Sequence, residues 1–400
     1  MRILLLSYYF RPDLSAGAFR ASALVESLLQ SMPKHAYIDV VTTLPNRYSN
    51  YSNNAFELIQ HPRLKVHRVA IPAHQSGMAD QSRAFYFYAR KCMSIAHGEK
   101  YDLIFSTSSR LMTAALGAWV AWRMRAQLYL DIRDIFVDTI KDVLSPKVSW
   151  LACPIFSLVE KLTLEQAQKV NVVSEGFLPY FKSRYPRQIF TCFTNGIDDE
   201  FLVGSDAVGT QIKGYHSDII NVLYAGNIGE GQGLHKIIPA LAKRLGSRVQ
   251  FTVIGDGGRR KQLEVALAEE NCPEVRMLPP VNRDGLIKAY RGADVLFLHL
   301  NNYPAFEKVL PSKIFEYAAM GKPILAGVGG YAARFINAEI DNAAVFEPCN
   351  VDSAVNAFNS LAMLNSPRKE FLKKYARADI MKRMSLDVLT LIPDASIIRS

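Results

Sequence analysis

The chain has 400 residues, of which 49% are hydrophobic and 21% charged, and its formal net charge is +10. This composition is typical of a folded protein rather than a disordered one, and the length favours two domains of somewhat under two hundred residues each. The five cysteines form no Cys-x-x-Cys pair, which argues against a disulfide framework or a zinc site, while the positive charge indicates anionic partners: phosphates, an acidic membrane surface or nucleic acid.

The first ten residues, MRILLLSYYF, combine a basic residue with an apolar run, but Arg11 and Asp13 follow without a small-residue cleavage site. We interpret this segment as a first buried strand rather than a signal peptide. The longest other apolar stretches, 113–122 and 148–159, are too short to span a membrane. We therefore expect the protein to stay in the cytoplasm.

Short β-rich runs alternate with helical patterns in the first half of the chain. Helices are predicted between most of the strands, as at 18–29 and 111–124. This alternation predicts a parallel, doubly wound sheet covered by helices. The predicted strands are 2–7, 37–42, 65–71, 103–106, 127–132, 169–174 and 190–194.

Two loops of this first half carry candidate site residues. In the loop after the first strand, Gly17 lets backbone approach a phosphate, and Arg20, one turn into the next helix, supplies positive charge. A plain turn is an equally good interpretation of a lone glycine. After the strand AQLYLDI, Asp134 is a candidate base and Arg133 a candidate phosphate ligand. An Arg–Asp ion pair that only braces the loop is the alternative.

The alternation restarts in the second half, after the sharp turn NGID at 195–198 and a polar stretch to Ser217 that we interpret as a linker. Helices are predicted at 234–245 and 260–269 among others. The predicted strands are 221–225, 249–254, 275–278, 295–299, 324–326 and 343–346. We therefore expect two Rossmann-like domains, 1–205 and 206–381, with the segment from about 382 to 400 packing back on the first. A small ligand would bind beyond the carboxyl ends of the strands.

Two glycine-rich turns of the second half follow predicted strands. The first, in LYAGNIGEGQGLHK, is neither G-x-G-x-x-G nor a P-loop, although it could hold an anion. The second, in GDGGRRKQLE, brings Arg259 and two further bases to the start of a helix, where they could reach a diphosphate. A solvated helix start is the alternative for these bases.

The stretch PSKIFEYAAMGKPILAG, residues 311–327, predicts a helix that begins at Pro311, ends at Gly321 and leads into a buried strand. Glu316 is the one acidic residue in this otherwise apolar helix. The first-turn amides could hold an anion and the carboxylate could accept hydrogen bonds from a polyol. The alternative is a core helix whose Glu316 faces water.

Bases and aromatics are interleaved in two helical segments of the first half. One segment holds Arg83, Phe85, Tyr86, Phe87, Tyr88, Arg90 and Lys91, and the other holds Trp119, Trp122, Arg123 and Arg125. Such mixtures suit an anionic membrane interface, although they also occur on ordinary helices. They would also suit single-stranded nucleic acid, but the sequence contains no known nucleic-acid-binding module, so we expect no nucleic-acid partner.

Five motifs occur together in one order and spacing: VVSEGF, TNGIDDEF, VIGDG, YRGADVLFLHL and PSKIFEYAAMGKPILA. With them the chain resembles the retaining, nucleotide-sugar-dependent glycosyltransferases of family 4 from about Met1 to about Met384. LDIRDIF and PSK resemble in particular the subgroup that builds bacterial capsule, O-antigen and exopolysaccharide on lipid carriers. The resemblance implies the GT-B fold, in which two Rossmann-like domains face each other across a cleft.

The resemblance also assigns roles to individual residues. It puts the donor ribose hydroxyls on Glu316 and the nucleobase against Gly255, Asp256 and Gly257. It puts donor phosphate on the amides from Leu310 to Ser312 and near Gly17, and the acceptor near Asp134. The further candidates for donor binding are Arg20, Asn227, Gly229, Arg259 and Lys313.

The chain departs from the family pattern at several of these positions. The first acid of the family's Glu-x7-Glu pattern falls on Lys308, so this acid is either missing or supplied by Glu307 through a one-residue shift. The family's diphosphate-binding Arg and Lys fall on the neutral Asn227 and Gln232, and a replacement charge must come from Lys308, Lys313 or Arg259. Arg133 stands where many members carry a histidine. The candidate catalytic residues are Asp134, Arg133, Glu307 and Lys308.

The family implies transfer with retention at the anomeric carbon, from a UDP-sugar to a lipid-linked or growing glycan. It implies neither metal nor cofactor, because helix ends and Lys or Arg stabilise the departing diphosphate. We expect a peripheral location at the inner face of the plasma membrane. The alternatives are a nucleotide-sugar epimerase or hydrolase on the same frame, and a catalytically degenerate scaffold.

Overall fold

The computed structural model describes residues 1–13, 15–44, 61–72, 78–108, 111–138, 146–202 and 219–392. The chain divides into two compact units: the first comprises 1–195 and 377–400, and the second comprises 196–376. The first unit thus ends before the expected boundary at 205, and the chain returns to it before residue 382. Most of the segment expected to be a linker lies outside the described residues.

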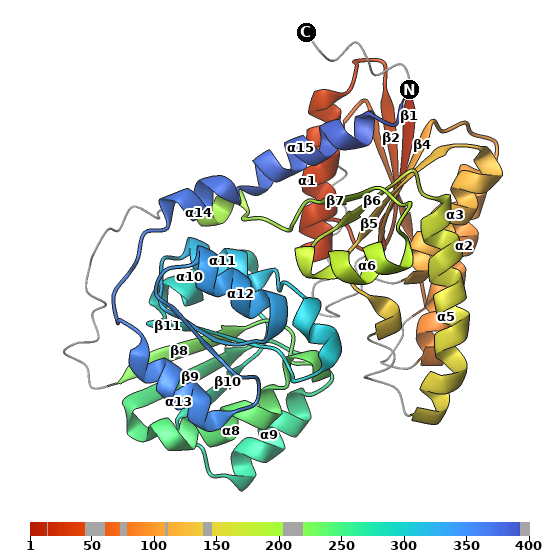
Figure 1. Ribbon diagram of the computed structural model, residues 1–400. Coiled ribbons are helices and arrows are strands. Elements are labelled where there is room, and N and C mark those ends of the chain that lie inside the picture. Colours follow the sequence, from red (N-terminus) through yellow and green to blue (C-terminus); the bar gives the residue numbers. More distant parts are fainter. Residues whose placement is uncertain are drawn as a thin grey trace. The chain divides into compact units, whose positions relative to one another are not determined.

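The first unit contains a seven-stranded sheet in the order β3-β2-β1-β4-β5-β6-β7, and every neighbouring pair is parallel (Figure 1). Ile3 to Leu6 of β1 have no exposed surface, as expected of a central parallel strand that is covered on both faces. The strands are β1 (Arg2–Leu6), β2 (Tyr37–Thr43), β3 (Leu64–Val69), β4 (Leu103–Ser108), β5 (Gln127–Ile132), β6 (Lys169–Val172) and β7 (Phe190–Cys192).

Helices cover this sheet, and the last of them comes from the far end of the chain. α15 (Arg377–Leu389) packs along α1 (Ala16–Ser31), where the Ser27 hydroxyl donates to the Ser385 hydroxyl at 3.0 Å. α1 begins at Ser15, whose side chain accepts a hydrogen bond from the Ala18 amide. The other helices are α2 (Met78–Ala96), α3 (Leu111–Met124), α5 (Pro146–Gln166), the short helix η2 (Glu175–Phe177) and α6 (Leu178–Arg184).

The second unit contains a six-stranded parallel sheet in the order β10-β9-β8-β11-β12-β13. All thirteen predicted strands of the two sheets are present, and the predicted α/β class with two parallel sheets is confirmed. The strands are β8 (Ile220–Ala225), β9 (Val249–Ile254), β10 (Val275–Leu278), β11 (Val295–His299), β12 (Ile324–Gly327) and β13 (Ala343–Phe346).

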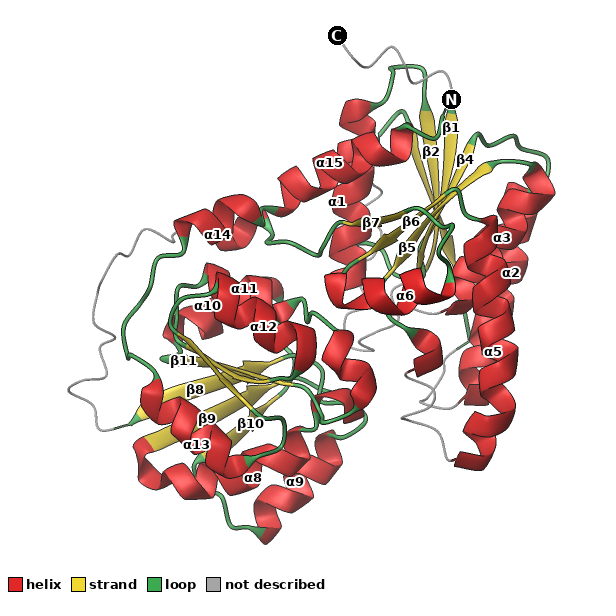
Figure 2. Cartoon of the chain, in the orientation of Figure 1, coloured by secondary structure: helices red, strands yellow, loops and turns green. Residues whose placement is uncertain are grey.

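Helices cover both faces of this second sheet (Figure 2). The side chains between the sheet and these helices form two hydrophobic clusters. One cluster includes side chains of α10, α11 and α12, and the other includes side chains of α8, α9 and α13. The helices of this unit are α7 (Asp199–Leu202), α8 (Leu234–Leu245), α9 (Arg260–Glu269), α10 (Arg283–Gly292), α11 (Lys313–Ala319), α12 (Gly330–Glu339), α13 (Val351–Ser360) and α14 (Lys369–Lys374), with the short helices η4 (Glu230–Gln232), η5 (Gly246–Arg248) and η6 (Pro304–Lys308).

The predicted helix over 311–321 is present as α11, which is shorter than the sequence pattern indicates. Gly321 follows it with a φ of +67°, a left-handed conformation in which glycine has no steric penalty. β12 then begins at Ile324. The loops after β8, β9 and β11, and with them the start of α11, lie at the edge of the sheet where the carboxyl ends of its strands meet.

Candidate active site

Two glycine-rich turns, after β8 and after β9, pack against each other at the carboxyl edge of the second sheet. The amide of Gly226 donates to the carbonyl of Ile254 at 2.8 Å. Gly255 has a φ of +150°, and a Cβ atom there would lie 1.8 Å from the carbonyl oxygen of Gly226. Because only glycine permits this approach, both turns form one closely packed backbone surface.

Asp256 and Gly257 continue this contact. Gly257 has a φ of +156°, and a Cβ atom there would lie 2.5 Å from the carbonyl oxygen of Ile228. The Asp256 carboxylate is exposed and accepts from the Gly257 amide at 2.8 Å. The three residues expected to face the nucleobase therefore lie beside the first glycine turn.

Asn227 and Gln232, the neutral residues at the family's cationic positions, bind each other. The Asn227 side-chain amide donates to Gln232 Oε1 at 2.8 Å, and the backbone amide of Gly229 donates to the same oxygen at 3.2 Å. This pair closes the turn through neutral hydrogen bonds. It brings no positive charge to the turn, so a diphosphate bound there would need another cation.

Lys313 is the candidate cation that lies at this turn. Its ammonium is 3.4 Å from the Tyr224 hydroxyl and 4.9 Å from the centroid of the Tyr224 ring. A Cβ atom on Gly226 would lie 2.1 Å from Lys313 Nζ, so the ammonium rests on the backbone of the first glycine turn. The first residue of α11 therefore brings positive charge to the end of β8.

Arg259 is close to the same turns, but its guanidinium is paired with an acid. Arg259 Nε lies 2.6 Å from Glu230 Oε2, and the Tyr303 hydroxyl donates to Glu230 Oε1 at 2.5 Å. The hydrogen bond from Tyr303 and the charge of Arg259 hold the pKa of Glu230 below its usual value, against a smaller effect of burial. Binding a diphosphate through Arg259 would require this pair to open.

Glu307 and Lys308 lie in η6, which packs against the start of α12. A Cβ atom on Gly330 would lie 2.0 Å from the carbonyl oxygen of Glu307, so the backbone of η6 is fixed there. The Glu307 side chain is exposed and Lys308 is half-buried. The one-residue shift that would place Glu307 at the family's first acidic position stays a prediction.

Leu310 and Ser312 lie in the connection between η6 and α11. Leu310 is buried in the core, and Ser312 immediately precedes α11 without a side-chain cap hydrogen bond. Their backbone therefore lies next to Lys313, as the expected phosphate position requires. Whether these amides bind phosphate stays a prediction.

Glu316, in the first turn of α11, is 15% exposed and bonded on both oxygens. Arg283 Nη1 donates to Glu316 Oε1 at 3.4 Å, and the Tyr290 hydroxyl donates to Oε2 at 3.1 Å. The alternative in which Glu316 simply faces water is therefore wrong. The carboxylate is held in a defined orientation by two residues of α10.

Sequence reasoning missed Arg283 and Tyr290. Both are far from Glu316 in sequence, and neither belongs to the motifs that singled out the site. Tyr290 begins the motif YRGADVLFLHL, which was assigned to the family but given no role. The available signal was their spacing, because residues seven apart on a helix lie on the same face.

In the first unit, the structure brings together Gly17 and Arg133, which were predicted separately. Gly17 lies in the first turn of α1, and a Cβ atom there would lie 2.0 Å from Arg133 Nη1. The guanidinium therefore rests against the backbone at the start of the helix. A guanidinium and first-turn amides together suit an anion.

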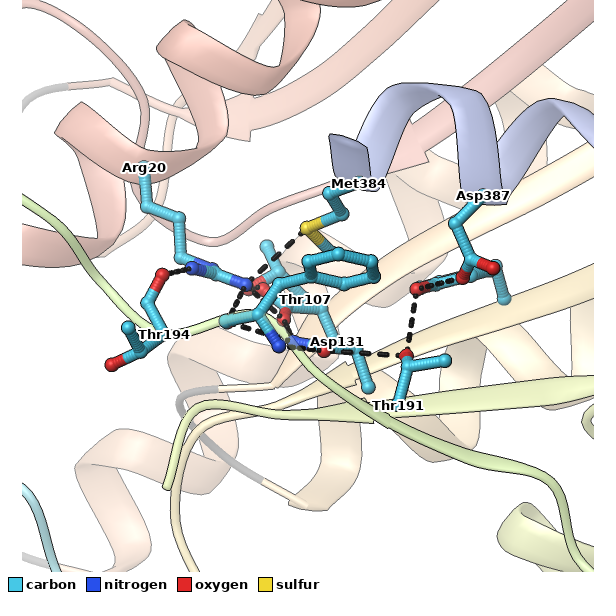
Figure 3. A network of polar contacts seen from close by, with 10 residues as sticks. Arg20, Thr107, Asp131, Thr191, Thr194, Met384 and Asp387 are labelled. Atoms are coloured by element: carbon cyan, nitrogen blue, oxygen red, sulfur yellow. Dashed lines mark hydrogen bonds and ion pairs between the residues drawn. The ribbon is translucent and has the colours of Figure 1, made fainter. Parts of the chain in front are cut away.

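Arg20 requires a correction, because the residue is only 1% exposed and its donors are engaged (Figure 3). Nε and Nη2 donate to the two oxygens of Asp131 at 2.9 Å each. Nη1 and Nη2 also donate to the carbonyls of Thr194 and Phe193, at 2.7 and 2.8 Å, and Nη2 lies 3.3 Å from the sulfur of Met384. Arg20 is thus a buried structural residue and not a ligand for donor phosphate.

The Arg–Asp pair considered as a loop brace does exist, but it joins Asp131 to Arg20. Asp131 also accepts hydrogen bonds from Asn171 at 2.8 Å and from Thr107 at 3.2 Å. Burial opposes ionisation of Asp131, but the Arg20 charge and these hydrogen bonds hold its pKa below the usual value. The pair fixes α1, β5 and the segment after β7 within the first unit.

Asp134 is exposed and borders a small cavity of about 10 Å³, room for about one water molecule. The same cavity is lined by Ser108 and by Glu160, which accepts from the hydroxyls of Tyr180 and Tyr185 at 3.1 and 3.0 Å. Desolvation of the carboxyl against the wall of this cavity raises the pKa of Asp134 to about 6, although the residue as a whole is exposed and the Arg133 charge lowers the pKa in part. Asp134 is thus a carboxylate with the properties of a base near neutral pH.

Exposed apolar side chains gather on α2, α3 and α5. All three tryptophans of the chain are among them, with Trp119, Trp122 and Trp150 exposed by 46%, 63% and 80%. Tyr88 of the predicted aromatic stretch is instead fully buried. We call the following set the aromatic surface: Tyr86, Phe87, Trp119, Trp122, Trp150, Ile155, Leu158 and Leu162.

Two observations concern metals and membrane spans. Within the ranges that the structure describes, no group of three or more His, Cys, Asp or Glu side chains could hold a metal ion. No helix among those ranges is long and apolar enough to cross a membrane.

Two family models match the chain, one in each unit. Residues 22–188 match the glycosyl transferase 4-like domain, and residues 213–379 match the glycosyl transferases group 1. A relative in Escherichia coli K12, the glycosyl transferase WcaI, is named for colanic acid biosynthesis and is 31% identical over 100 residues. That match covers 25% of this chain and 24% of WcaI, so it spans about a quarter of the relative.

Solved structures share the fold over the whole chain at low sequence identity. HepE of Anabaena, solved with UDP and glucose, has a TM-score of 0.60 and 16% identity, covering 99% of this chain and 98% of HepE. WaaG, a glycosyltransferase involved in lipopolysaccharide biosynthesis, has a TM-score of 0.59 and 13% identity, covering 100% of both chains. At such identities these structures establish the fold and nothing further.

Proposed function

We propose that this chain, which belongs to the family 4 glycosyltransferases of GT-B fold, transfers a sugar from a nucleotide diphosphate donor, a UDP-sugar, to a lipid-linked or growing glycan in surface polysaccharide biosynthesis. The observation that carries the proposal is the carboxyl edge of the second sheet. There, the ammonium of Lys313 rests on two closely packed glycine turns, and the oriented carboxylate of Glu316 lies in the same first turn of α11. The carboxylate suits the ribose hydroxyls and the cation suits the diphosphate. The exposed backbone of the turns suits a flat base.

In this proposal the donor lies with its ribose at Glu316 and its diphosphate at Lys313. The ammonium, together with amides of the glycine turn and of residues 310–312, stabilises the negative charge that develops on the departing diphosphate. Such stabilisation replaces a divalent cation, so the reaction proceeds without metal. We infer retention at the anomeric carbon from family membership.

In this proposal, residues of the first unit bind the acceptor. Asp134, with its pKa of about 6, accepts the proton of the acceptor hydroxyl and is ionised at cytoplasmic pH. Arg133 and the start of α1 at Gly17 offer a position for phosphate. A lipid-linked acceptor contains such a phosphate, which supports this choice of acceptor.

The aromatic surface supports peripheral attachment to an anionic membrane. Exposed bases accompany it on α2 and α3, including Arg83, Arg90, Lys91 and Arg123. Tryptophan side chains favour the headgroup region of a bilayer, and nearby bases favour anionic lipid. Attachment at the inner face of the plasma membrane would give the enzyme access to its acceptor.

The second candidate is a degenerate, non-catalytic member of the same family. It is favoured by Asn227 and Gln232, which bring no positive charge to the positions where the family has Arg and Lys. It is also favoured by Arg259, whose charge is already paired with Glu230.

A turnover assay distinguishes these functions. The protein is incubated with UDP-sugars and EDTA, with and without a bacterial lipid fraction, and UDP release is measured. We expect release that depends on the lipid fraction, that is lost in Glu316→Gln and that yields a glycan with the anomeric configuration of the donor. Equal UDP release without acceptor would indicate a hydrolase, and conversion of the donor into an isomeric UDP-sugar without UDP release would indicate an epimerase. No turnover with any donor would favour the degenerate member.

A further inference from the structure

Two residues of α10 donate to opposite oxygens of Glu316. Arg283 is the first residue of α10, after Asn282, whose side chain caps the helix by accepting from the Gly285 amide at 2.9 Å. Tyr290 follows two turns later on the same face. Arg283 donates to Oε1 at 3.4 Å and Tyr290 donates to Oε2 at 3.1 Å. The carboxylate plane of Glu316 is thus defined by one rigid helix.

The position of Arg283 is itself set by other groups. Its Nη2 donates to Asp198 and its Nε donates to Glu200, both at 2.7 Å, and the guanidinium lies 4.3 Å from the centroid of the Phe201 ring. The two hydrogen bonds to Asp198 and Glu200 are shorter than its 3.4 Å contact with Glu316. The turn at 198–201 therefore fixes the guanidinium, and the guanidinium in turn orients Glu316.

Tyr290 is equally well fixed. It is 1% exposed, stacks at 6.0 Å on Phe201 and meets Tyr317 edge to face at 5.2 Å. Its hydroxyl therefore has little freedom to follow a moving carboxylate. The Phe201 ring contacts both Arg283 and Tyr290, the two residues that donate to Glu316. It therefore fixes the positions of these two residues relative to each other.

This arrangement leaves Glu316 suited to a pair of neighbouring hydroxyls. Each carboxylate oxygen can accept about two hydrogen bonds, and each already accepts one. One acceptor direction per oxygen remains, and a vicinal diol carries two donors. Without Arg283, Oε1 would lose its partner and the negative charge would lose its counter-ion, so the carboxylate could rotate about its side-chain bonds.

We propose that Arg283 is the positioning residue that orients Glu316 to bind the vicinal hydroxyls of the donor ribose. The proposal rests on the proposed function, because it takes the ligand of Glu316 to be a nucleotide. It adds a residue to the donor site and joins that site to the turn at 198–201.

The test compares UDP with dideoxy-UDP, which lacks both ribose hydroxyls, by calorimetric titration of the full chain. The variants are Arg283→Met, Arg283→Lys and, as a matched control, Arg244→Met, which breaks an exposed ion pair with Asp352 in the same unit, with side chains 60% and 76% exposed. The same titrations with GDP and dideoxy-GDP test the case in which the donor carries guanine instead of uracil. Thermal melting establishes that each variant is folded.

We expect the parent protein to prefer UDP over dideoxy-UDP by about tenfold or more, as hydrogen bonds to a charged group imply. Arg283→Met should reduce this preference to less than about threefold while its affinity for dideoxy-UDP stays nearly unchanged, because the lost contact is with the hydroxyls. Arg283→Lys, which keeps the charge but not the planar fork, should fall between the two, and the control Arg244→Met should keep the parent preference.

Three results are distinguishable. If the parent binds no nucleotide, the proposed function fails and the inference fails with it. If the parent binds UDP and dideoxy-UDP equally, the inference is overturned while the transferase proposal survives. If Arg283→Met is unfolded, Arg283→Lys decides, and a preference in Arg283→Lys equal to that of the parent overturns the inference.

Discussion

Replacing Asp131 with asparagine tests the structural role that we give to Arg20. The substitution conserves size but leaves the Arg20 guanidinium buried without its counter-ion. Both side chains of the pair are 2% exposed, so water cannot replace the lost carboxylate. The structural account therefore predicts a large loss of stability in the first unit.

The magnitude follows from the burial of the pair. Removing one partner of a buried ion pair costs about 3–5 kcal/mol, because an uncompensated charge remains in a low dielectric. For a unit of this size the cost corresponds to a fall of roughly 10 °C in the melting midpoint. Replacing both Arg20 and Asp131 with apolar residues should cost less than the two single changes combined.

Unfolding in urea, followed by circular dichroism, measures this loss. Tryptophan fluorescence assigns the transition, since Trp119, Trp122 and Trp150 all belong to the first unit. A matched control is Glu165→Gln, which breaks the exposed pair between Lys161 and Glu165 in the same unit. The side chains of that pair are 59% and 55% exposed, and the loss should stay below about 1 kcal/mol.

A loss in Asp131→Asn no larger than that of the control would show that the buried pair contributes no more to stability than an exposed one. It would mean that Arg20 finds other partners or reaches solvent. In that case the original prediction, in which Arg20 binds donor phosphate, would have to be reconsidered.

Three further predictions follow from the site and the surface. Because the pKa of Asp134 is raised to about 6, kcat/KM should rise with pH through about 6 and level off above it, and Asp134→Asn should remove this dependence together with most of the activity. Lys313→Met should weaken UDP binding about tenfold, since it removes the ammonium at the glycine turn, whereas Lys308→Met should change it less. The double variant Trp122→Ser and Trp150→Ser should co-sediment with phosphatidylglycerol vesicles about tenfold less than the parent protein, because it loses two exposed indole rings from the aromatic surface. Unchanged co-sedimentation would contradict the membrane proposal.

The pH dependence of stability offers a separate check of the buried pair. The folded-state pKa of Asp131 is depressed, so its contribution is present above the unfolded value of 3.8 and is lost as the pH falls through the folded value. Parent and Asp131→Asn should therefore differ most near neutral pH and converge in acid.

The fold could be predicted from the sequence because its signals are local. The run ILLL of β1 and the other apolar segments appear as strands at the expected places, and Gly321 ends α11 as a helix-terminating glycine should. Two parallel sheets follow from the alternation of strands and helices. None of these inferences required knowing which distant residues meet.

The site was predicted less completely because its contacts are long-range. Glu316 was identified from its own helix. Its contact with Arg283 depends on how α10 packs against α11, and the contact of Lys313 with Gly226 depends on how α11 packs against β8. Arg20 was given a ligand role because charge near a helix start resembles a phosphate site. Only the position of Asp131 in the fold shows that the Arg20 charge forms a buried ion pair within the first unit.

If the second unit binds a nucleotide through Glu316, calorimetric titration of UDP in the presence of EDTA will detect this binding in the parent protein. We expect binding with a dissociation constant of roughly 1 μM–1 mM, the range of enzyme substrates, and a loss of about tenfold in Glu316→Gln. Absence of binding for UDP and for every other nucleotide diphosphate, or equal binding by Glu316→Gln, would contradict the account.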